Sequence, residues 1–411
     1  MNALRRLAQY AQAMNRVILT HSTLLTALKD HLPSNKQRQT IVDGLLYAYQ
    51  LDQECEILPI APMEWALLEQ YHDADFIQEL TRPRDVIDQQ SENYKTMQEC
   101  INDEFEELDD DEQELSSSVQ DEKFGLSFDC YPFPFMRYYV NLTAASTIQL
   151  ARRLVNSTNE TESRRTIGIN WYGGRHHCHR SRCSGFCYVN DVVLGITTIR
   201  KMCSGGVFYL DLDLHNGDGV AEAFKFSKKV STCSVHRHDV GFFPVGTGRL
   251  DVSVAGMYNV PTRRGLTDED MLWIIENIVL KLIEKHQPDY LVVQLGCDGL
   301  ALDPNNEWNM TIQGYSSVMR LLLGNVGLPI MVLGGGGYNH TEVAKCWTFV
   351  TGTLLGYGVD KFDEIPEHRQ LDHYESDGFM FWTDSNLHPR KMRNGNDLEY
   401  LQHLKSHLLS L

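Results

Sequence analysis

The chain has 411 residues, of which 42% are hydrophobic and 10% aromatic. This is enough apolar material to bury a large core, and it excludes wholesale disorder. The longest apolar runs are far shorter than the roughly 20 residues that span a bilayer, so we expect no membrane association. The net charge is −18 and no basic stripe is present, which argues against direct binding to nucleic acid.

The first 29 residues carry four basic side chains and no acidic one. A plain amphipathic helix and a mitochondrial presequence both have this composition, and no cleavage point decides between them. Ten cysteines without paired spacing favour free thiols in a reducing compartment. We expect residues 1–16 to form an extension ahead of a single domain over residues 17–411.

Residues 99–122 contain twelve acidic side chains and no basic one. Such a block repels itself and has little to bury, so it predicts a mobile insertion at about 88–124 rather than a folded element. A solubilising loop explains the block more simply than a docking site for a basic partner, although both fit.

After this block, short apolar runs alternate with helix-length segments. The runs predict strands over 166–171, 207–214, 230–235, 290–295 and 330–333. The segments between them predict helices over 189–201, 268–286 and 314–324. This order indicates an α/β fold, a mostly parallel sheet with helices on both faces. Periodicity is weaker from about residue 359 until a helix-like end over 397–409.

The predicted strand that begins at residue 207 ends in a cluster of polar side chains. Alternation places Asp211, Asp213 and His215 on one face. Burying two carboxylates and an imidazole is costly unless they are paired or coordinate a metal. A metal site is therefore the favoured interpretation, and a hydrogen-bonded polar strand end is the alternative.

The predicted strand over 290–295 also delivers an acid, Asp298, to the carboxyl edge of the sheet. Ligands bind at this edge in parallel sheets. With Asp213 and His215, Asp298 would complete a set of ligands that leaves a position open for water, as catalytic metal sites require. Oxygen-rich ligation also suits other divalent ions, and a single Asp after a strand can be a helix cap.

Two adjacent histidines, His176 and His177, follow a pair of glycines after the strand at 166–171. Both can face a cleft, where they would offer a general base and a general acid. A structural zinc knot is the rival interpretation, although the spacings match no usual paired-cysteine pattern. Its ligands would be Cys178, His179, Cys183 and Cys187.

Four glycines at 334–337 place Tyr338 just beyond the strand at 330–333. A glycine-rich segment is also typical of a phosphate cradle, but the Lys-Ser/Thr of a P-loop is missing. A tyrosine hydroxyl at this edge can donate a hydrogen bond to an oxyanion.

These four segments, in this order, resemble the arginase-like α/β fold of class I histone deacetylases. The resemblance runs over about 128–356 and implies a zinc-dependent hydrolase that removes acetyl groups from lysine in proteins. It implies that Asp213, His215 and Asp298 bind the zinc. The catalytic residues that it implies are His176, His177, Asp211, Asp218 and Tyr338.

The same resemblance implies further binding residues. The substrate-binding residues would be Asp129, Gly185, Phe186 and Phe243. Arg38 would line an internal acetate channel. A potassium site behind the zinc would use backbone carbonyls of Asp211, Asp213 and His215, together with Ser234 and Val235.

The resemblance also implies a substrate class and a place of action. The segment 306–312 is similar to fungal Hos-type members, so the expected partner is an acetylated histone tail or a cohesin subunit, in the nucleus and cytoplasm. Pro304 and Thr341 stand where corepressor-bound relatives have arginines, so no inositol-phosphate-dependent corepressor is expected. A catalytically weak acetyl-lysine binding protein and an acetylpolyamine amidohydrolase are the alternatives.

Overall fold

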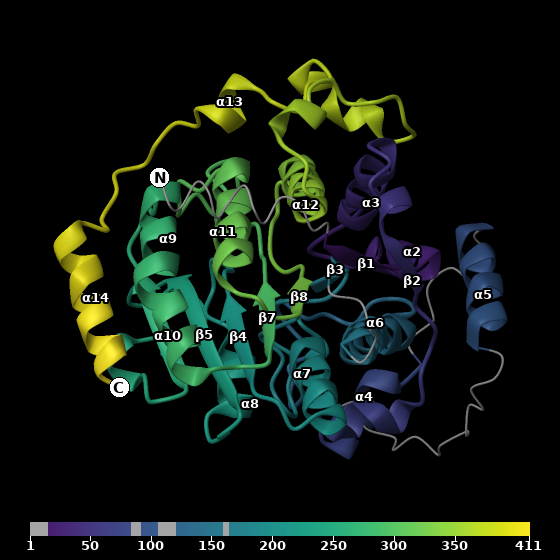
Figure 1. The fold of residues 1–411 in the computed structure, drawn as a ribbon. Helices are drawn as coiled ribbons and strands as arrows, with labels where there is room; N and C mark the ends of the chain where they lie inside the picture. Colours follow the sequence, from purple (N-terminus) through teal and green to yellow (C-terminus); the bar gives the residue numbers. More distant parts are fainter. Residues whose placement is uncertain (1–14, 84–91, 106–120, 159–163) are drawn as a thin grey trace.

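A computed structural model describes residues 15–83, 92–105, 121–158 and 164–411. Eight strands form one sheet, and all neighbouring strands run parallel (Figure 1). In spatial order they are β2 (Glu56–Pro59), β1 (Arg16–His21), β3 (Thr166–Asn170), β8 (Ile330–Leu333), β7 (Tyr290–Gln294), β4 (Val207–Asp211), β5 (Val230–Arg237) and β6 (Met257–Thr262). The predicted α/β fold with a parallel sheet is confirmed.

Helices cover both faces of this sheet. The first four residues of β7 are apolar because both sides of the strand are buried. Leu291 and Val293 pack into one core cluster, and Tyr290 and Val292 pack into the other. The first face is covered by α3 (Arg38–Ala48), α9 (Asp268–Ile274), α10 (Leu280–His286), α11 (Ile312–Asn325), α12 (His340–Leu355) and α14 (Leu398–Ser410). The second is covered by α6 (Met136–Ser157), α7 (Asp191–Met202) and α8 (Asp218–Phe224).

A third apolar cluster joins α6 to three helices from the first part of the chain. These are α2 (Thr23–Lys29), α4 (Ala74–Thr81) and α5 (Glu92–Phe105). The expected mobile insertion at about 88–124 includes residues 92–105, which form α5 in the structure. Ile101 and Phe105 are buried there, and the Phe105 ring lies 4.7 Å from that of Tyr138. Residues 106–120 lie outside the described residues.

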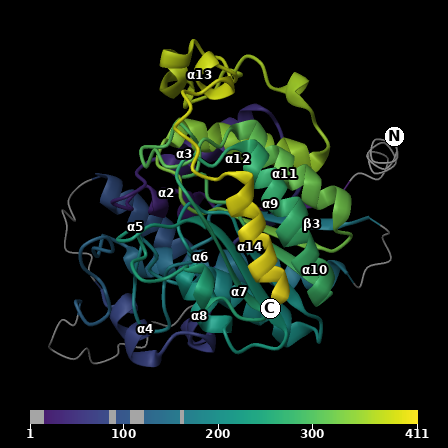
Figure 2. The ribbon, with the colours of Figure 1, turned by 90° about the vertical axis from the view of Figure 1, so that its left-hand side faces the viewer.

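The two ends of the domain are also defined. Arg16 already belongs to β1, so the domain begins one residue earlier than expected, and residues 1–14 lie outside the described part. At the other end, α14 packs alongside α9 and α10, with Leu401, Leu404 and Leu408 in the core (Figure 2). The short α13 (Asp384–Leu387) lies in the preceding segment. None of the described helices is long and apolar enough to cross a membrane.

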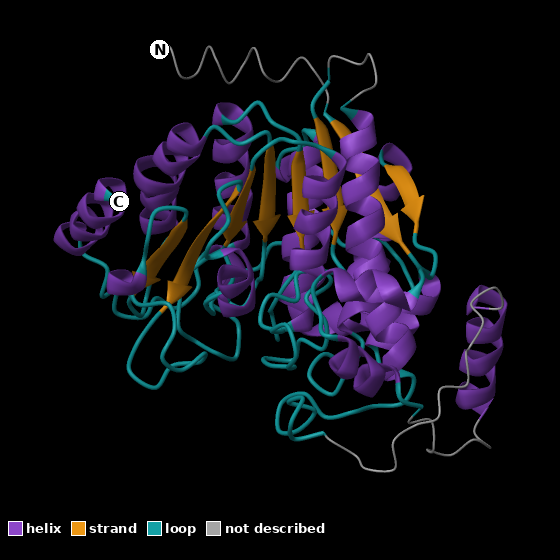
Figure 3. Cartoon of the chain, turned by 90° about the horizontal axis from the view of Figure 1, so that it is seen from below, coloured by secondary structure: helices purple, strands orange, loops and turns teal. Residues whose placement is uncertain are grey.

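Because every strand runs the same way, all the carboxyl ends lie on one edge of the sheet. Figure 3 shows the arrowheads pointing to that edge and the long loops gathered beyond it. The segments that follow β3, β4, β7 and β8 carry the polar residues singled out above, and these four strands are neighbours in the sheet. The topology therefore brings residues more than a hundred positions apart to one place.

Candidate active site

The three expected metal ligands converge beyond β4 and β7. These strands pair with Asp211 opposite Gln294, so the segments that follow them start side by side. Asp213, His215 and Asp298 each offer one ligand atom, and these atoms all lie within 4.8 Å of one another. Both carboxylates are buried, and His215 is partly buried. The strand ends at Asp211, so Asp213 and His215 lie in the turn beyond it rather than within the predicted strand.

Hydrogen bonds orient the two carboxylates. Asp213 Oδ2 accepts from Gln294 Nε2 and from the backbone N–H of Gly336, both at 2.8 Å. One oxygen of Asp298 accepts a backbone N–H of the segment after β4 at 2.9 Å. The other oxygens face His215 Nδ1, at 3.4 Å from Asp213 Oδ1 and 2.9 Å from Asp298 Oδ2. One oxygen of each carboxylate and one ring nitrogen therefore point at a common position.

The charges at this position fit a cation. Burial and the neighbouring Asp213 raise the pKa of Asp298 to about 7. Burial opposes protonation of His215, but its hydrogen bonds to Asp213 and Asp298 raise its pKa to about 10. Asp298 therefore holds a proton more readily than an ordinary carboxyl group, and a divalent ion would supply positive charge in place of protons. The donor set suits zinc.

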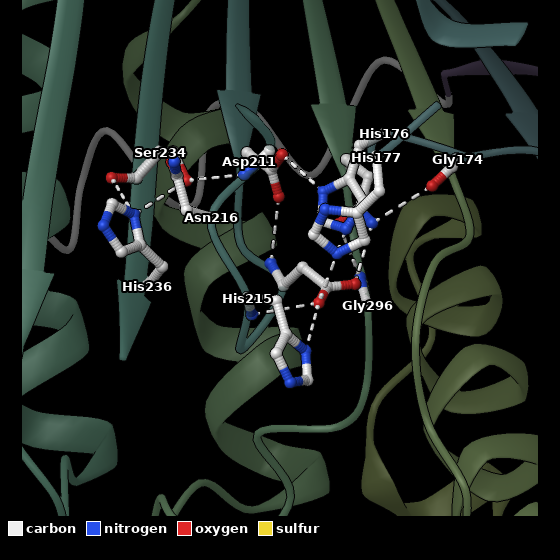
Figure 4. A network of polar contacts seen from close by, with 12 residues as sticks. Gly174, His176, His177, Asp211, His215, Asn216, Ser234, His236 and Gly296 are labelled. Atoms are coloured by element: carbon white, nitrogen blue, oxygen red, sulfur yellow. Dashed lines mark hydrogen bonds and ion pairs between the residues drawn. The ribbon is translucent and has the colours of Figure 1, made fainter. Parts of the chain in front are cut away.

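His176 and His177 lie beside this cluster, and each is held by its own carboxylate (Figure 4). His176 Nδ1 is 2.8 Å from Asp211 Oδ2, and His177 Nδ1 is 2.8 Å from Asp218 Oδ1. The two imidazole centres are 3.9 Å apart. Tyr209 donates a further hydrogen bond to Asp211 at 2.7 Å.

The two histidines differ in charge. Burial opposes protonation of His176, but Asp211 and Asp213 outweigh it and raise the pKa of His176 to about 9. Burial and the neighbouring His176 lower the pKa of His177. At neutral pH the pair therefore offers one protonated imidazole and one neutral imidazole that can accept a proton.

Tyr338 is placed by the glycine segment after β8. Its backbone N–H donates to Asp303 Oδ2 at 2.7 Å, and Arg38 Nη1 donates to the carbonyls of Gly335 and Gly337 at 3.0 and 2.9 Å. Burial and the nearby carboxylates raise the pKa of Tyr338 well above its usual value, so its hydroxyl keeps its proton. Arg38 is fully buried beneath this segment.

Two aromatic rings border the histidines and the tyrosine. The Phe243 ring centre is 4.9 Å from that of His177, and the Phe186 ring centre is 5.9 Å from that of Tyr338. Phe243 is 37% exposed, so it reaches the surface. The structure thus brings both expected wall residues to the site.

Gly185 lies directly against His177. A Cβ at Gly185 would come within 2.4 Å of His177 Cδ2, and the φ of +55° also favours glycine. The Gly185 N–H donates to Asp129 Oδ2 at 2.8 Å, which ties the segment that carries Asp129 to the site.

The expected potassium residues lie on β4, in the turn that follows it, and on the neighbouring strand β5. Asp211 at the end of β4 pairs with Ser234 on β5. Ser234 Oγ lies 2.9 Å from His236 Nδ1, and Figure 4 shows both on the side of Asp211 opposite His176 and His177. Val235 follows within the same strand.

The rival zinc knot finds no support in the structure. Over the residues that the structure describes, the cluster of Asp213, His215 and Asp298 is the only group able to hold a metal ion. Cys178, Cys183 and Cys187 are buried free thiols.

Sequence reasoning missed two residues that orient the site. Gln294 is a polar residue within an apolar strand, and its amide holds Asp213. Asp303 precedes a proline, and it accepts the Tyr338 N–H. A lone polar residue inside a buried strand was the available signal for Gln294.

The sequence is similar to those of known proteins. The model of the histone deacetylase domain matches residues 31–354. The chain is 33% identical over 399 residues to histone deacetylase 8 of Xenopus tropicalis, a match that covers 95% of this chain and 97% of that protein. It is 35% identical over 301 residues to histone deacetylase HOS1 of Saccharomyces cerevisiae, covering 67% of this chain and 63% of that protein.

A plant relative matches over most of the chain as well. Histone deacetylase 9 of Arabidopsis thaliana is 33% identical over 393 residues, which cover 91% of this chain and 82% of that protein. The chain therefore belongs to the histone deacetylase family, and it is a lysine deacetylase.

Proposed function

We propose that this chain is a zinc-dependent hydrolase that releases acetate from acetyl-lysine in proteins. The observation that carries the proposal is the convergence of Asp213, His215 and Asp298 within 4.8 Å, beside two histidines that are each held by a carboxylate. One oxygen of each carboxylate and His215 Nδ1 would hold the ion. A bound zinc ion supplies a Lewis acid that makes water more acidic and polarises a carbonyl.

The side chains around that position would carry the proton transfers. His177, neutral at neutral pH, would take a proton from the attacking water as its oxygen bonds to the acetyl carbon. It would return this proton to the lysine nitrogen as the C–N bond breaks. The second proton of the water would then pass from acetic acid to the amine, which leaves acetate and the lysine ammonium group. Tyr338 would donate its hydrogen bond to the carbonyl oxygen as negative charge develops there.

The two other catalytic assignments are electrostatic. His176, protonated and held by Asp211, would place positive charge beside the developing oxyanion. Asp218 would fix the ring of His177 so that its free nitrogen faces the substrate. The contacts of Nδ1 in each ring support these roles, because they leave Nε2 for the reaction.

The substrate side chain would enter between Phe186 and Phe243. A neutral, flat acetyl group on an aliphatic chain suits aromatic walls, whereas a charged ammonium group would lose hydration there. Gly185 would leave room beside His177 for the aliphatic part of the acetyl-lysine side chain, and Asp129 would bind the substrate backbone at the rim.

Two further sites belong to this proposal. Arg38 would line the route by which acetate leaves, since its Nε and Nη2 have no hydrogen-bond partner among the described residues. Potassium would bind the carbonyls of Asp211, Asp213 and His215 together with Ser234 and Val235, whose strands lie side by side.

The proposed substrates are an acetylated histone tail or an acetylated cohesin subunit, in the nucleus and cytoplasm. Incubating the purified chain with both substrates and with an acetylpolyamine, side by side, tests this. Release of acetate from either protein and not from the polyamine is expected. Turnover of the polyamine alone, or binding of acetyl-lysine without turnover, would contradict the proposal.

The enzyme is also proposed to act without an inositol-phosphate-dependent corepressor. A polyphosphate requires several convergent cations, and Pro304 and Thr341 supply none. Inositol hexakisphosphate should therefore leave the rate on an acetyl-lysine peptide unchanged at low salt, where weak binding is strongest. Strong activation by the phosphate would refute this part of the proposal.

A further inference from the structure

The contact between His177 and Asp218 continues outward to the surface. Asp218 Oδ1 faces His177 Nδ1 at 2.8 Å, and its other oxygen lies 3.4 Å from His179 Nε2. The opposite ring nitrogen of His179, Nδ1, lies 2.6 Å from Glu222 Oε2. Side-chain exposure rises along this series, from 5% and 9% for the inner pair to 30% for His179 and 69% for Glu222.

The local fold explains this arrangement. Asp218 and Glu222 lie four residues apart on α8, so their side chains share one face of the helix. Gly219 lets this helix approach the histidine segment, because a Cβ there would come within 2.6 Å of the Cys178 carbonyl oxygen. His179 can therefore bridge two carboxylates of one helix.

The surrounding charges favour a protonated His179. A hydrogen bond to Asp218 raises the pKa of His179, burial opposes this, and Glu222 raises it further. Burial opposes ionisation of Asp218, but hydrogen bonds from His177 and His179 lower its pKa. Of the other charged groups nearby, Arg180 is paired with Asp73 at 2.7 Å.

We propose that His179 is a positioning residue for deacetylation. It fixes Asp218 from the side opposite His177, and Glu222 in turn fixes His179. This inference rests on the proposed role of His177 as the general base, and His179 itself does not reach the substrate.

The test compares His179→Ala with the unmodified protein on an acetyl-lysine peptide. Loss of an outer partner of this kind lowers kcat by about 10-fold, and KM and zinc content should stay unchanged because neither the tunnel nor the ligands are altered. His179→Lys should restore kcat, since its ammonium group can pair with Asp218 from the same side.

Glu222→Gln gives a second, milder variant that leaves the buried residues in place. Its matched control is Glu284→Gln on α10, where the glutamate is 67% exposed and paired with Lys281. We expect a smaller fall in kcat for Glu222→Gln and none for Glu284→Gln. The proposal is overturned if His179→Ala and Glu222→Gln both keep the normal kcat, or if His179→Ala loses activity and His179→Lys does not restore it.

The proposed function fails in a different way. If His177→Ala keeps full turnover, His177 is not the general base, whatever the His179 variants do.

Discussion

At the scale of single residues, the active site is built from charged groups that are buried in pairs. His176 and His177 are adjacent in sequence and both lie next to a carboxylate, yet their pKa values are shifted in opposite directions. His176 faces Asp211 with Asp213 nearby, whereas His177 lies beside the positive charge of His176 itself. The residue types alone could not assign these roles, because the difference arises from which charges lie around each ring.

Tyr338→Phe tests the oxyanion role of the hydroxyl. The ring would still be held by Phe186 and by the backbone bond to Asp303, so the fold and the zinc content should not change. Turnover should fall by roughly 10²-fold or more, the scale for loss of one oxyanion donor. The measurement is kcat on an acetyl-lysine peptide, with zinc content as the control. A nearly normal rate would mean that Tyr338 takes no part in the reaction.

At the scale of elements, apolar runs in the sequence predicted the five central strands but not β1, β2 and β6. Strand β2 is an edge strand with alternating exposure, and β6 contains Asn259 and Pro261, so neither has a continuous apolar run. Helix α5 was missed because its second half belongs to the acidic run that begins at residue 99, although apolar residues such as Ile101 and Phe105 are buried there.

The candidate site was predictable to a similar extent. Each motif could be located at the end of a predicted strand, but the convergence of Asp213 and Asp298 depends on the pairing of β4 with β7, more than eighty residues apart. Local periodicity carries no information about that pairing. The support from Gln294 and Asp303 likewise depends on tertiary contacts.

The glycine segment after β8 provides a prediction at this scale. A Cβ at Gly336 would come within 2.4 Å of Asp298 Oδ2 and 3.1 Å of Asp213 Oδ2. Gly336→Ala should therefore displace one carboxylate and lower both zinc content and turnover. Gly327→Ala is the matched control, because nothing lies within 4 Å of its Cβ position. Normal zinc binding by Gly336→Ala would show that the segment does not constrain the ligands.

At the scale of the whole molecule, the C-terminal region is held to the domain by a buried cation. Lys345 on α12 is fully buried, and its Nζ lies 3.3 Å from Glu342 Oε1 and 2.5 Å from Asp377 Oδ2. Asn386 Nδ2 also lies within 3.5 Å of Glu342 Oε1. This contact joins the helix that follows Tyr338 to the region after residue 359.

Lys345→Met should lower the free energy of unfolding by about 3 kcal/mol, because it leaves a buried carboxylate without its cation. Lys281→Met, which breaks an exposed pair with Glu284, should change it by no more than about 0.5 kcal/mol. Denaturant unfolding of both variants provides the comparison. Equal stability of the two would mean that the buried contact does not hold the C-terminal region.

The central claim is that Asp213, His215 and Asp298 bind a catalytic zinc ion. The most direct test is zinc content and acetyl-lysine turnover measured together on the purified protein, on Asp213→Ala and on His215→Ala, with the exposed Asp239→Asn as control. We predict one zinc per chain in the unmodified protein and the control, and loss of zinc and activity together in both ligand variants. Retention of zinc and full turnover by either ligand variant would contradict the assignment.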